Sequence, residues 1–271
     1  MSRNPKKLSI RDDRPIRMRI THCDNGSSGS FFIIRGIIMD IKKYLKDPCN
    51  SLSMPYWKHK KTSTRSDIMI VHDNKFDPVL YRDWHDTVQF RLKHDLQGLT
   101  STKINDGFFY KTVNDTCLAD VLSVINQTEK EIEITKNDLN HWKSEDSYCK
   151  ELWILVYNKK IYHRNKDKTV IYDEFGNRIN NDKHYLPVGL MISNFDHITK
   201  EASIELLEIV PAYRKLDLKE SLVRESLLRI SEVADFVTVS GKVDSESQDF
   251  TLYKKLGFTH DAIWHVLKKN Y

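Results

Sequence analysis

The residues best placed to do chemistry follow a predicted strand that ends at Val210. Arg214, Lys215 and Lys219 supply positive charge where a helix is predicted to begin. The free N–H groups at a helix N-terminus point outward, and together with the helix dipole they favour a bound anion. The sequence therefore predicts an anion-binding turn between the strand and the helix.

Asp217 stands in this turn and allows two interpretations. Asp217 and Glu220 have the spacing of a capping box, in which the Asp side chain accepts hydrogen bonds from the first N–H groups of the helix. Such a carboxylate would occupy the groups that an anion needs and would repel the anion by about 1 kcal/mol at 4 Å in water. We favour the helix cap, although the three cations could offset the repulsion.

Other residue types that often do chemistry form no recognisable site. The 11 histidines include no H-x-x-x-H or H-E-x-x-H pair, and the triplets 84–86 and 93–95 lie about 13.5 Å apart on a predicted helix. We therefore expect no metal site. Cys49 has no evident partner as a nucleophile, and we interpret all the cysteines as reduced thiols: Cys23, Cys49, Cys117 and Cys149.

The elements that would position the turn lie in the second half of the chain. Alternation and helical periodicity predict, in order, strands 151–157, 187–195 and 202–210, helix 218–234, strand 236–240, helix 247–256 and strand 262–267. Strands 187–195 and 202–210 should form a hairpin, and Gly257 should end the last helix. This order implies a mixed, mostly antiparallel sheet with helices packed on it, an α/β (α+β) fold.

The first half of the chain contains shorter stretches with helical or strand patterns. We predict helices at 40–46, 81–96, 116–128 and 137–143, and a buried strand at 67–72. The helix at 81–96 rests on apolar residues at positions 81, 84, 88, 92 and 96. A polar segment, 158–184, contains a turn at 173–177. Residues 39–150 are therefore expected to form a region of helices and loops.

The formal net charge of +5 is carried entirely by residues 1–38, which hold eight Lys or Arg and three Asp residues. The remaining chain is neutral, which argues against nucleic-acid binding as a general property. No apolar stretch reaches the 18 residues that a membrane-spanning helix needs. We therefore expect a cytoplasmic protein with no membrane association.

Residues 1–38 form a separate segment, in which residues 1–30 show no periodicity and end in a turn-rich run at 24–30. Arg35-Gly36 can be encoded as AGG-GGN, which resembles a bacterial ribosome-binding site shortly before an ATG. We hypothesise that translation begins at Met39 and that 1–38 is a disordered or non-native extension. We assign no function to this segment.

Residues 203–234 and the later run Leu252-Tyr253-Lys254-Lys255-Leu256-Gly257-Phe258 together resemble the GNAT superfamily of N-acetyltransferases. In that family a strand ends near Pro and Tyr-Arg, and a loop of pattern [RQ]-x-x-G-x-[GA] wraps the cofactor pyrophosphate. Here Arg214 keeps the first loop position, whereas Asp217 and Lys219 replace the glycines. The resemblance covers about 151–267, and runs at 53–58, 240–244 and 264–267 further resemble a bacterial small-molecule-type subgroup.

The resemblance implies acetyl-CoA as co-substrate and a set of site residues. Tyr253 would be the acid that protonates the departing thiolate, and Glu205 and Glu208 would be candidate bases for the amine. These two residues lie three apart, so strict alternation puts them on opposite faces unless a bulge intervenes. The main chain at Ile209 and Val210 would hold the pantetheine and polarise the thioester carbonyl. The pyrophosphate would lie on the loop residues Arg214, Lys215, Leu216, Asp217, Leu218 and Lys219.

Each of these residues also has a plain structural interpretation. Tyr253 could be a packing tyrosine, Glu205 and Glu208 solvent-facing positions, and Arg214 a surface arginine. The resemblance nevertheless implies a GNAT domain at 151–271 that transfers acetyl groups to an amine by direct attack. The region 39–150 would shape the site for that small-molecule or protein amine.

Two other functions stay open. The altered loop favours a degenerate GNAT-fold module that binds an acyl-CoA or a partner without transferase activity. The aromatic and basic run at 56–61 would suit an RNA-associated protein, although we favour an anchoring aromatic pair followed by solvated lysines.

Overall fold

We describe the protein from a computed structural model, which describes residues 31–34, 37–51, 68–101, 103–128, 134–159, 185–243 and 249–269. The turn predicted at 173–177, the run at 56–61, Cys23 and most of the segment 1–38 lie outside these residues. A small sheet of two antiparallel strands, β1 (Phe31–Ile34) and β2 (Ile37–Asp40), precedes helix α1 (Ile41–Lys46).

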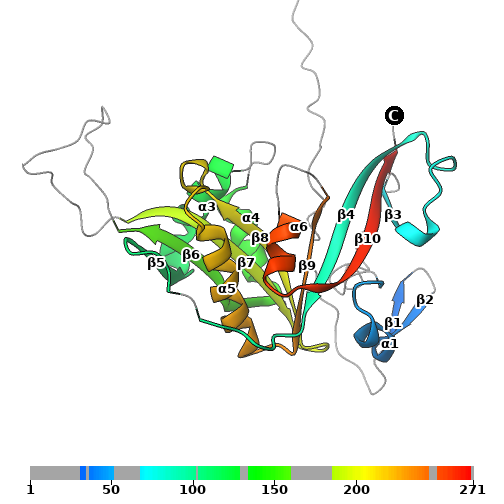
Figure 1. Cartoon of the computed structure of the whole chain (residues 1–271), viewed down its shortest axis with the longest axis horizontal. Coiled ribbons are helices and arrows are strands. Elements are labelled where there is room, and N and C mark those ends of the chain that lie inside the picture. Colours follow the sequence, from blue (N-terminus) through cyan, green and yellow to red (C-terminus); the bar gives the residue numbers. More distant parts are fainter. Residues whose placement is uncertain are drawn as a thin grey trace, which may run out of the picture.

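The main sheet has eight strands in the spatial order β3-β10-β4-β9-β8-β7-β6-β5 (Figure 1). Their bounds are β3 Ile68–His72, β4 Trp84–His94, β5 Phe108–Thr112, β6 Tyr148–Asn158, β7 Leu186–Asp196, β8 Glu201–Ile209, β9 Phe236–Lys242 and β10 Thr259–Lys269. Every neighbouring pair is antiparallel except β8 and β9, which are parallel. This confirms the predicted mixed, mostly antiparallel α+β fold.

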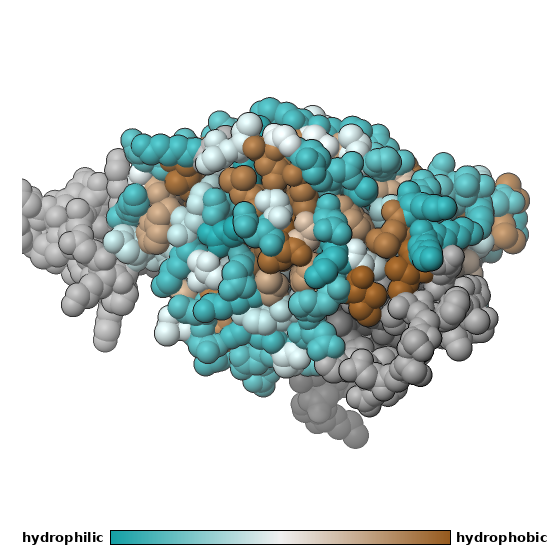
Figure 2. Space-filling model, turned by 90° about the horizontal axis from the view of Figure 1, so that it is seen from below, coloured by the Kyte–Doolittle hydropathy of each residue, from teal (hydrophilic) through white to brown (hydrophobic). Residues whose placement is uncertain are grey.

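Helices cover both faces of the sheet (Figure 1). One core packs α5 (Leu218–Ser231) and α6 (Asp249–Lys255) against the strands, and a second core packs α3 (Leu118–Thr128) and α4 (Lys136–Lys143) on the other side. Short 3-10 turns occur at η1 Asp73–Lys75, η2 Asp115–Cys117 and η3 Pro211–Tyr213. None of the described helices is long and apolar enough to cross a membrane. On the face in Figure 2, hydrophilic side chains separate several apolar patches.

The helix predicted at 81–96 is wrong, because residues 84–94 form strand β4. A spacing of four residues fits a helical face but is also a multiple of the strand period of two. Trp84, Val88, Phe90 and Leu92 follow that second period, and β4 pairs on both sides, with β9 and β10. The region 39–150, expected to be helices and loops, thus contributes three strands to the main sheet: β3, β4 and β5.

The sheet consists of two four-stranded arms that are joined at one short parallel contact. β8 pairs with β9 only from Glu201 to Ile204, opposite Phe236 to Val239. Beyond this point β8 continues along β7 as far as Ile209, while β9 continues along β4 as far as Lys242. No pairing joins the two arms beyond this point, and this unpaired stretch at the end of β8, just before helix α5 begins, is here called the gap between the arms.

A buried polar network lies at the junction of the two arms. Arg91 of β4 donates to Glu201 of β8 over 3.2 Å, and the Tyr44 hydroxyl of α1 donates to the same carboxylate over 2.6 Å. Thr238 of β9 donates to it as well. Burial raises the pKa of Glu201, and the Arg91 charge with the Thr238 and Tyr44 hydrogen bonds offsets part of that rise. The network ties α1, β4 and β9 to the first residue of β8.

Candidate functional site

A β-bulge in β8 changes which side chains share a face at the gap. Ile192 of β7 lies opposite Leu206, but the next residue of β7 lies opposite Ile204, so Glu205 is the extra residue. Ile204 packs in the core under α5, whereas Leu206 packs in the core under α3. The bulge thus places Glu205 and Glu208 on the same α3 side of β8. Strict alternation would have separated these two carboxylates.

The backbone at the end of β8 offers one N–H group to the gap. Val210 donates its N–H to the Val188 carbonyl in β7 over 2.9 Å, so this group is not free to polarise a ligand carbonyl. In an antiparallel pair successive residues face alternate sides, which turns the N–H of Ile209 away from β7 and toward the gap. Of the two backbone positions that the sequence suggested, only Ile209 offers a donor there.

Asp217 does not cap helix α5, which corrects the interpretation that the sequence favoured. Its backbone is left-handed, with φ 51° and ψ 17°, and its side chain makes no capping hydrogen bond. Glu220 also fails to complete a capping box, because its carboxylate binds Arg224 and Lys255. Among the described residues, none accepts a hydrogen bond from the N–H groups of Leu218, Lys219 or Glu220. The N-terminus of this 14-residue helix can therefore bind an anion.

Asp217 adopts a left-handed backbone at a position where the GNAT loop pattern has glycine. Left-handed geometry costs most residues about 1–2 kcal/mol, and Asp and Asn adopt it more readily than others. The helix start thus keeps a conformation that glycine favours, while its side chain adds a negative charge. The side chain of Asp217 is exposed, so solvent weakens the effect of that charge.

Two of the three cations around the turn, Lys219 and Arg214, already have partners within the protein. Lys219 forms an ion pair with Asp249 at the start of α6. Arg214 folds back so that its Nε donates to the Ile209 carbonyl over 3.3 Å. Lys215 is exposed, and Leu216 is held through its carbonyl by Asn105 Nδ2 at 3.2 Å. Arg214 and Lys215 are therefore the cations beside the helix start that no described carboxylate neutralises.

Tyr213 anchors the turn to the arm that contains β5 and β6. Its ring packs edge-on against Phe108, with centroids 6.1 Å apart, and its hydroxyl accepts a hydrogen bond from Asn158 over 3.1 Å. No sequence pattern indicates Asn105 or Asn158, because both residues lie far along the chain from the turn that they hold. Such contacts become visible only when the sheet is assembled.

Tyr253 lies on α6 in the same core as Ile209. Its side chain is buried, and its ring centroid lies 5.1 Å from Phe258 and 6.3 Å from Phe90. No described residue forms a hydrogen bond with its hydroxyl. Burial, and then the carboxylates of Asp249 and Glu208, raise the pKa of Tyr253. The hydroxyl is therefore protonated at neutral pH and could act as a proton donor.

Comparison with solved structures identifies this architecture. A GCN5-related N-acetyltransferase from Sphaerobacter thermophilus matches at a TM-score of 0.54 and 12% identity, over 75% of this chain and 60% of that chain. The chain has the GNAT fold. A GCN5-related N-acetyltransferase from Kribbella flavida aligns at a TM-score of 0.46 and 10% identity, over 75% of this chain and 68% of that chain. No family model and no curated protein matches the sequence.

At this level of identity the likeness establishes the GNAT fold alone. The ion pair between Lys219 and Asp249 brings the start of α5 next to the start of α6, the helix that carries Tyr253.

Proposed function

We propose that this protein transfers an acetyl group from acetyl-CoA to an amine. One observation carries the proposal. The arms of the sheet separate at the end of β8, where α5 begins with N–H groups that no described residue occupies. The gap suits the thin pantetheine chain of the donor, and the helix start suits its pyrophosphate. The acceptor would be a small-molecule or protein amine.

Each reacting atom has a candidate partner in this arrangement. Leu218, Lys219 and Glu220 would bind the pyrophosphate through their N–H groups, with Arg214 and Lys215 beside them. The N–H of Ile209 would polarise the thioester carbonyl. Glu205 or Glu208 would accept a proton from the amine, whose nitrogen forms the new bond to the acetyl carbon as the carbon–sulfur bond breaks. Tyr253 would give its proton to the departing thiolate.

A second candidate function is a GNAT-fold module that binds an acyl-CoA or another partner without catalysis. The negative charge of Asp217 and the ion pair that engages Lys219 favour this alternative, since both weaken the attraction for a pyrophosphate. A module without catalysis would not need a protonated tyrosine in the adjoining core. We therefore place it second.

An assay of thiol release separates the two functions. The full chain is incubated with acetyl-CoA and a mixture of primary amines, and free CoA is followed with a thiol reagent. A transferase releases CoA at a rate that depends on the amine, and mass spectrometry finds the acetylated product. Binding of acetyl-CoA without amine-dependent release would support the non-catalytic module.

Replacing Asp217 by Asn should tighten the binding of acetyl-CoA about three- to fivefold. The substitution removes a negative charge near the pyrophosphate site and keeps a residue that adopts the left-handed backbone. Asp217→Gly should tighten binding to a similar extent, because the charge is the common change. Calorimetric titration of both variants measures the effect. Weaker binding in both variants would show that the carboxylate helps to hold the donor.

A further inference from the structure

An aromatic side chain of β4 flanks the inner end of the gap, defined here as the end at which β8 and β9 still pair. Phe90 of β4 lies opposite Gly241 of β9, just beyond Val239, the last residue of β9 that pairs with β8. A Cβ atom on Gly241 would lie 2.7 Å from Phe90 Cζ, which is too close, so the tip of the ring takes the place of a side chain there. Because β9 lies between β4 and β8, the ring of Phe90 leans across β9 toward the gap.

The ring of Phe90 is held in place by the core under α6. Phe90 is only 1% exposed, and its ring centroid lies 5.3 Å from Phe250 and 6.3 Å from Tyr253, both on α6. A ring packed in this way moves only if its neighbours move with it, because protein cores are close-packed. Phe90 therefore forms a firm wall on the β9 side of the inner end.

The large side chain at the end of β8 points the other way. Ile209 leans over Gly189 of β7, where a Cβ atom would lie 2.8 Å from Ile209 Cδ1. At this position β8 therefore presents its backbone to the gap, including the N–H of Ile209. The two sides of the gap thus differ, with backbone at the end of β8 and an aromatic ring over β9.

The proposed position of acetyl-CoA directs its acyl group toward the inner end. The donor would enter beside the start of α5, with its thioester carbonyl at the Ile209 N–H and its sulfur near the Tyr253 hydroxyl. The acyl carbons lie beyond the thioester and would point to where β8 and β9 pair. Paired strands are only about 4.8 Å apart, which leaves no width for a further chain between them. Each added carbon would therefore approach the joined strands and the ring of Phe90.

We propose that Phe90 limits the acyl group of the donor to acetyl and excludes chains of four or more carbons. This inference rests on the proposed function, because that function places the donor in the gap. A methyl group would end before the ring, whereas the two further methylene groups of butanoyl would force the ring against Phe250 and Tyr253. Overpacking of this kind is costly in a core whose rings have no room to move.

Calorimetric titrations of the full chain with acetyl-CoA, butanoyl-CoA and CoA test this proposal. The wild type should bind acetyl-CoA at least about tenfold more tightly than butanoyl-CoA. Phe90→Leu removes the ring and should reduce this difference to less than about threefold by tightening the binding of butanoyl-CoA. Phe90→Met, whose flexible side chain can give way, should act in the same direction. CoA carries no acyl group and should bind to all these proteins with the same affinity.

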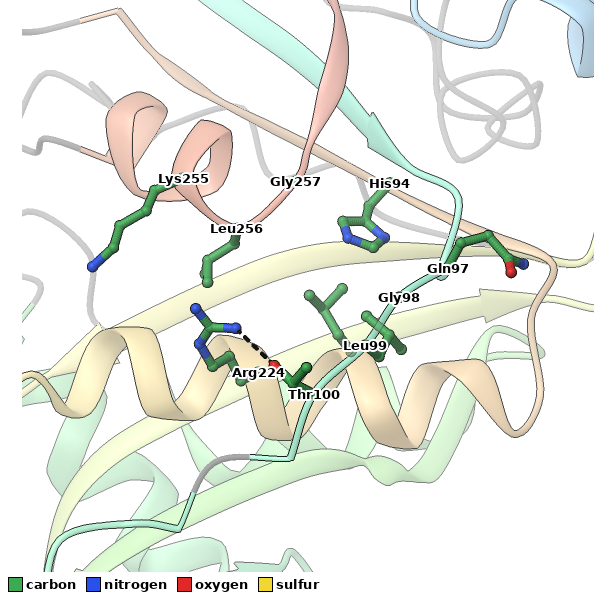
Figure 3. Close-up of a pocket in the computed structure, with 10 residues that line it drawn as sticks. His94, Gln97, Gly98, Leu99, Thr100, Arg224, Lys255, Leu256 and Gly257 are labelled. Carbon is green, nitrogen blue, oxygen red and sulfur yellow. Dashed lines mark hydrogen bonds between the residues drawn. The ribbon is translucent and has the colours of Figure 1, made fainter.

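Phe258→Leu is the matched control. Phe258 is also 1% exposed, and its ring centroid lies 5.1 Å from Tyr253. On its other side it packs against His94, which lies opposite Val237 near the start of β9 and therefore away from the gap. Figure 3 shows His94 there, at the edge of an open, polar pocket beside α5. Phe258→Leu should lower Tm as Phe90→Leu does and should keep the wild-type preference for acetyl-CoA.

The wild type alone can overturn the inference. Equal binding of acetyl-CoA and butanoyl-CoA would overturn it and leave the proposed function standing. A preference for acetyl-CoA that survives in both Phe90 variants, or that Phe258→Leu removes equally, would also overturn it, because Phe90 would then not be the cause. If the wild type binds neither thioester nor CoA, the proposed function fails, and this inference fails with it.

Discussion

Arg91→Met is expected to lower the free energy of unfolding by about 3 to 5 kcal/mol, because it leaves a buried carboxylate without its cation. Arg91 and Glu201 have only 6% and 1% of their side chains exposed, so water cannot replace the lost partner. Arg91 Nε also donates to the Pro48 carbonyl over 3.2 Å, which connects the segment after α1 to the sheet. Urea denaturation of the full chain measures the loss.

A second substitution, at Glu201, tests whether the unpaired carboxylate causes this loss of stability. Arg91→Met combined with Glu201→Gln should recover at least half of the loss, because the amide keeps partners for Tyr44 and Thr238 without a buried charge. The deficit of the single Arg91→Met variant should also shrink as the pH falls from 7 toward 5. Its folded state holds Glu201 at a pKa above the unfolded value, so the folded state takes up the proton first. A loss below about 1 kcal/mol, with no change between pH 7 and 5, would contradict the role of the network.

Tyr253→Phe is expected to lower kcat for acetyl transfer about 100-fold or more, because it removes the group that would protonate the thiolate. The aromatic ring remains and keeps its packing against Phe258 and Phe90. No described residue depends on the lost hydroxyl for a hydrogen bond, so Tm should stay the same or rise. The affinity for acetyl-CoA should change by less than about twofold.

Tyr110→Phe provides a matched control for this experiment. Tyr110 packs against the same core, and among the described residues its buried hydroxyl also has no partner at hydrogen-bond distance. It lies on β5, at the edge of the sheet away from the gap. This variant should keep its full rate, while Tyr253→Phe loses activity at equal stability. If both variants keep the wild-type rate, Tyr253 is a packing residue and another group protonates the thiolate.

The second half of the fold could be predicted because each element has one clear period and clear ends. Helix α5 carries apolar residues at helical spacing, and the left-handed Gly257, with φ 92°, ends α6 as predicted. The strands on each side of the β7–β8 turn lie within one residue of their predicted bounds. These features depend on contacts between residues close in sequence, which a periodic pattern can report.

Features set by contacts between distant residues could not be predicted. The pattern of β4 fits both a strand and a helix, and its position between β9 and β10 decides the outcome. The bulge at Glu205 depends on the register of β8 against β7, which the sequence of one strand does not contain. Asp217 is a further example. Asp is common both at helix N-caps and in left-handed backbone, so the residue type does not distinguish the two roles.

Calorimetric titration of acetyl-CoA into the full chain tests most directly whether the start of α5 binds the phosphates of acetyl-CoA, as we propose. We predict micromolar binding that Arg214→Ala weakens about tenfold, because Arg214 is a cation beside the free N–H groups that no described carboxylate neutralises. Arg82→Ala, an exposed arginine in the loop between β3 and β4, should bind like the wild type. No binding at millimolar acetyl-CoA, or equal binding in Arg214→Ala and Arg82→Ala, would contradict this assignment.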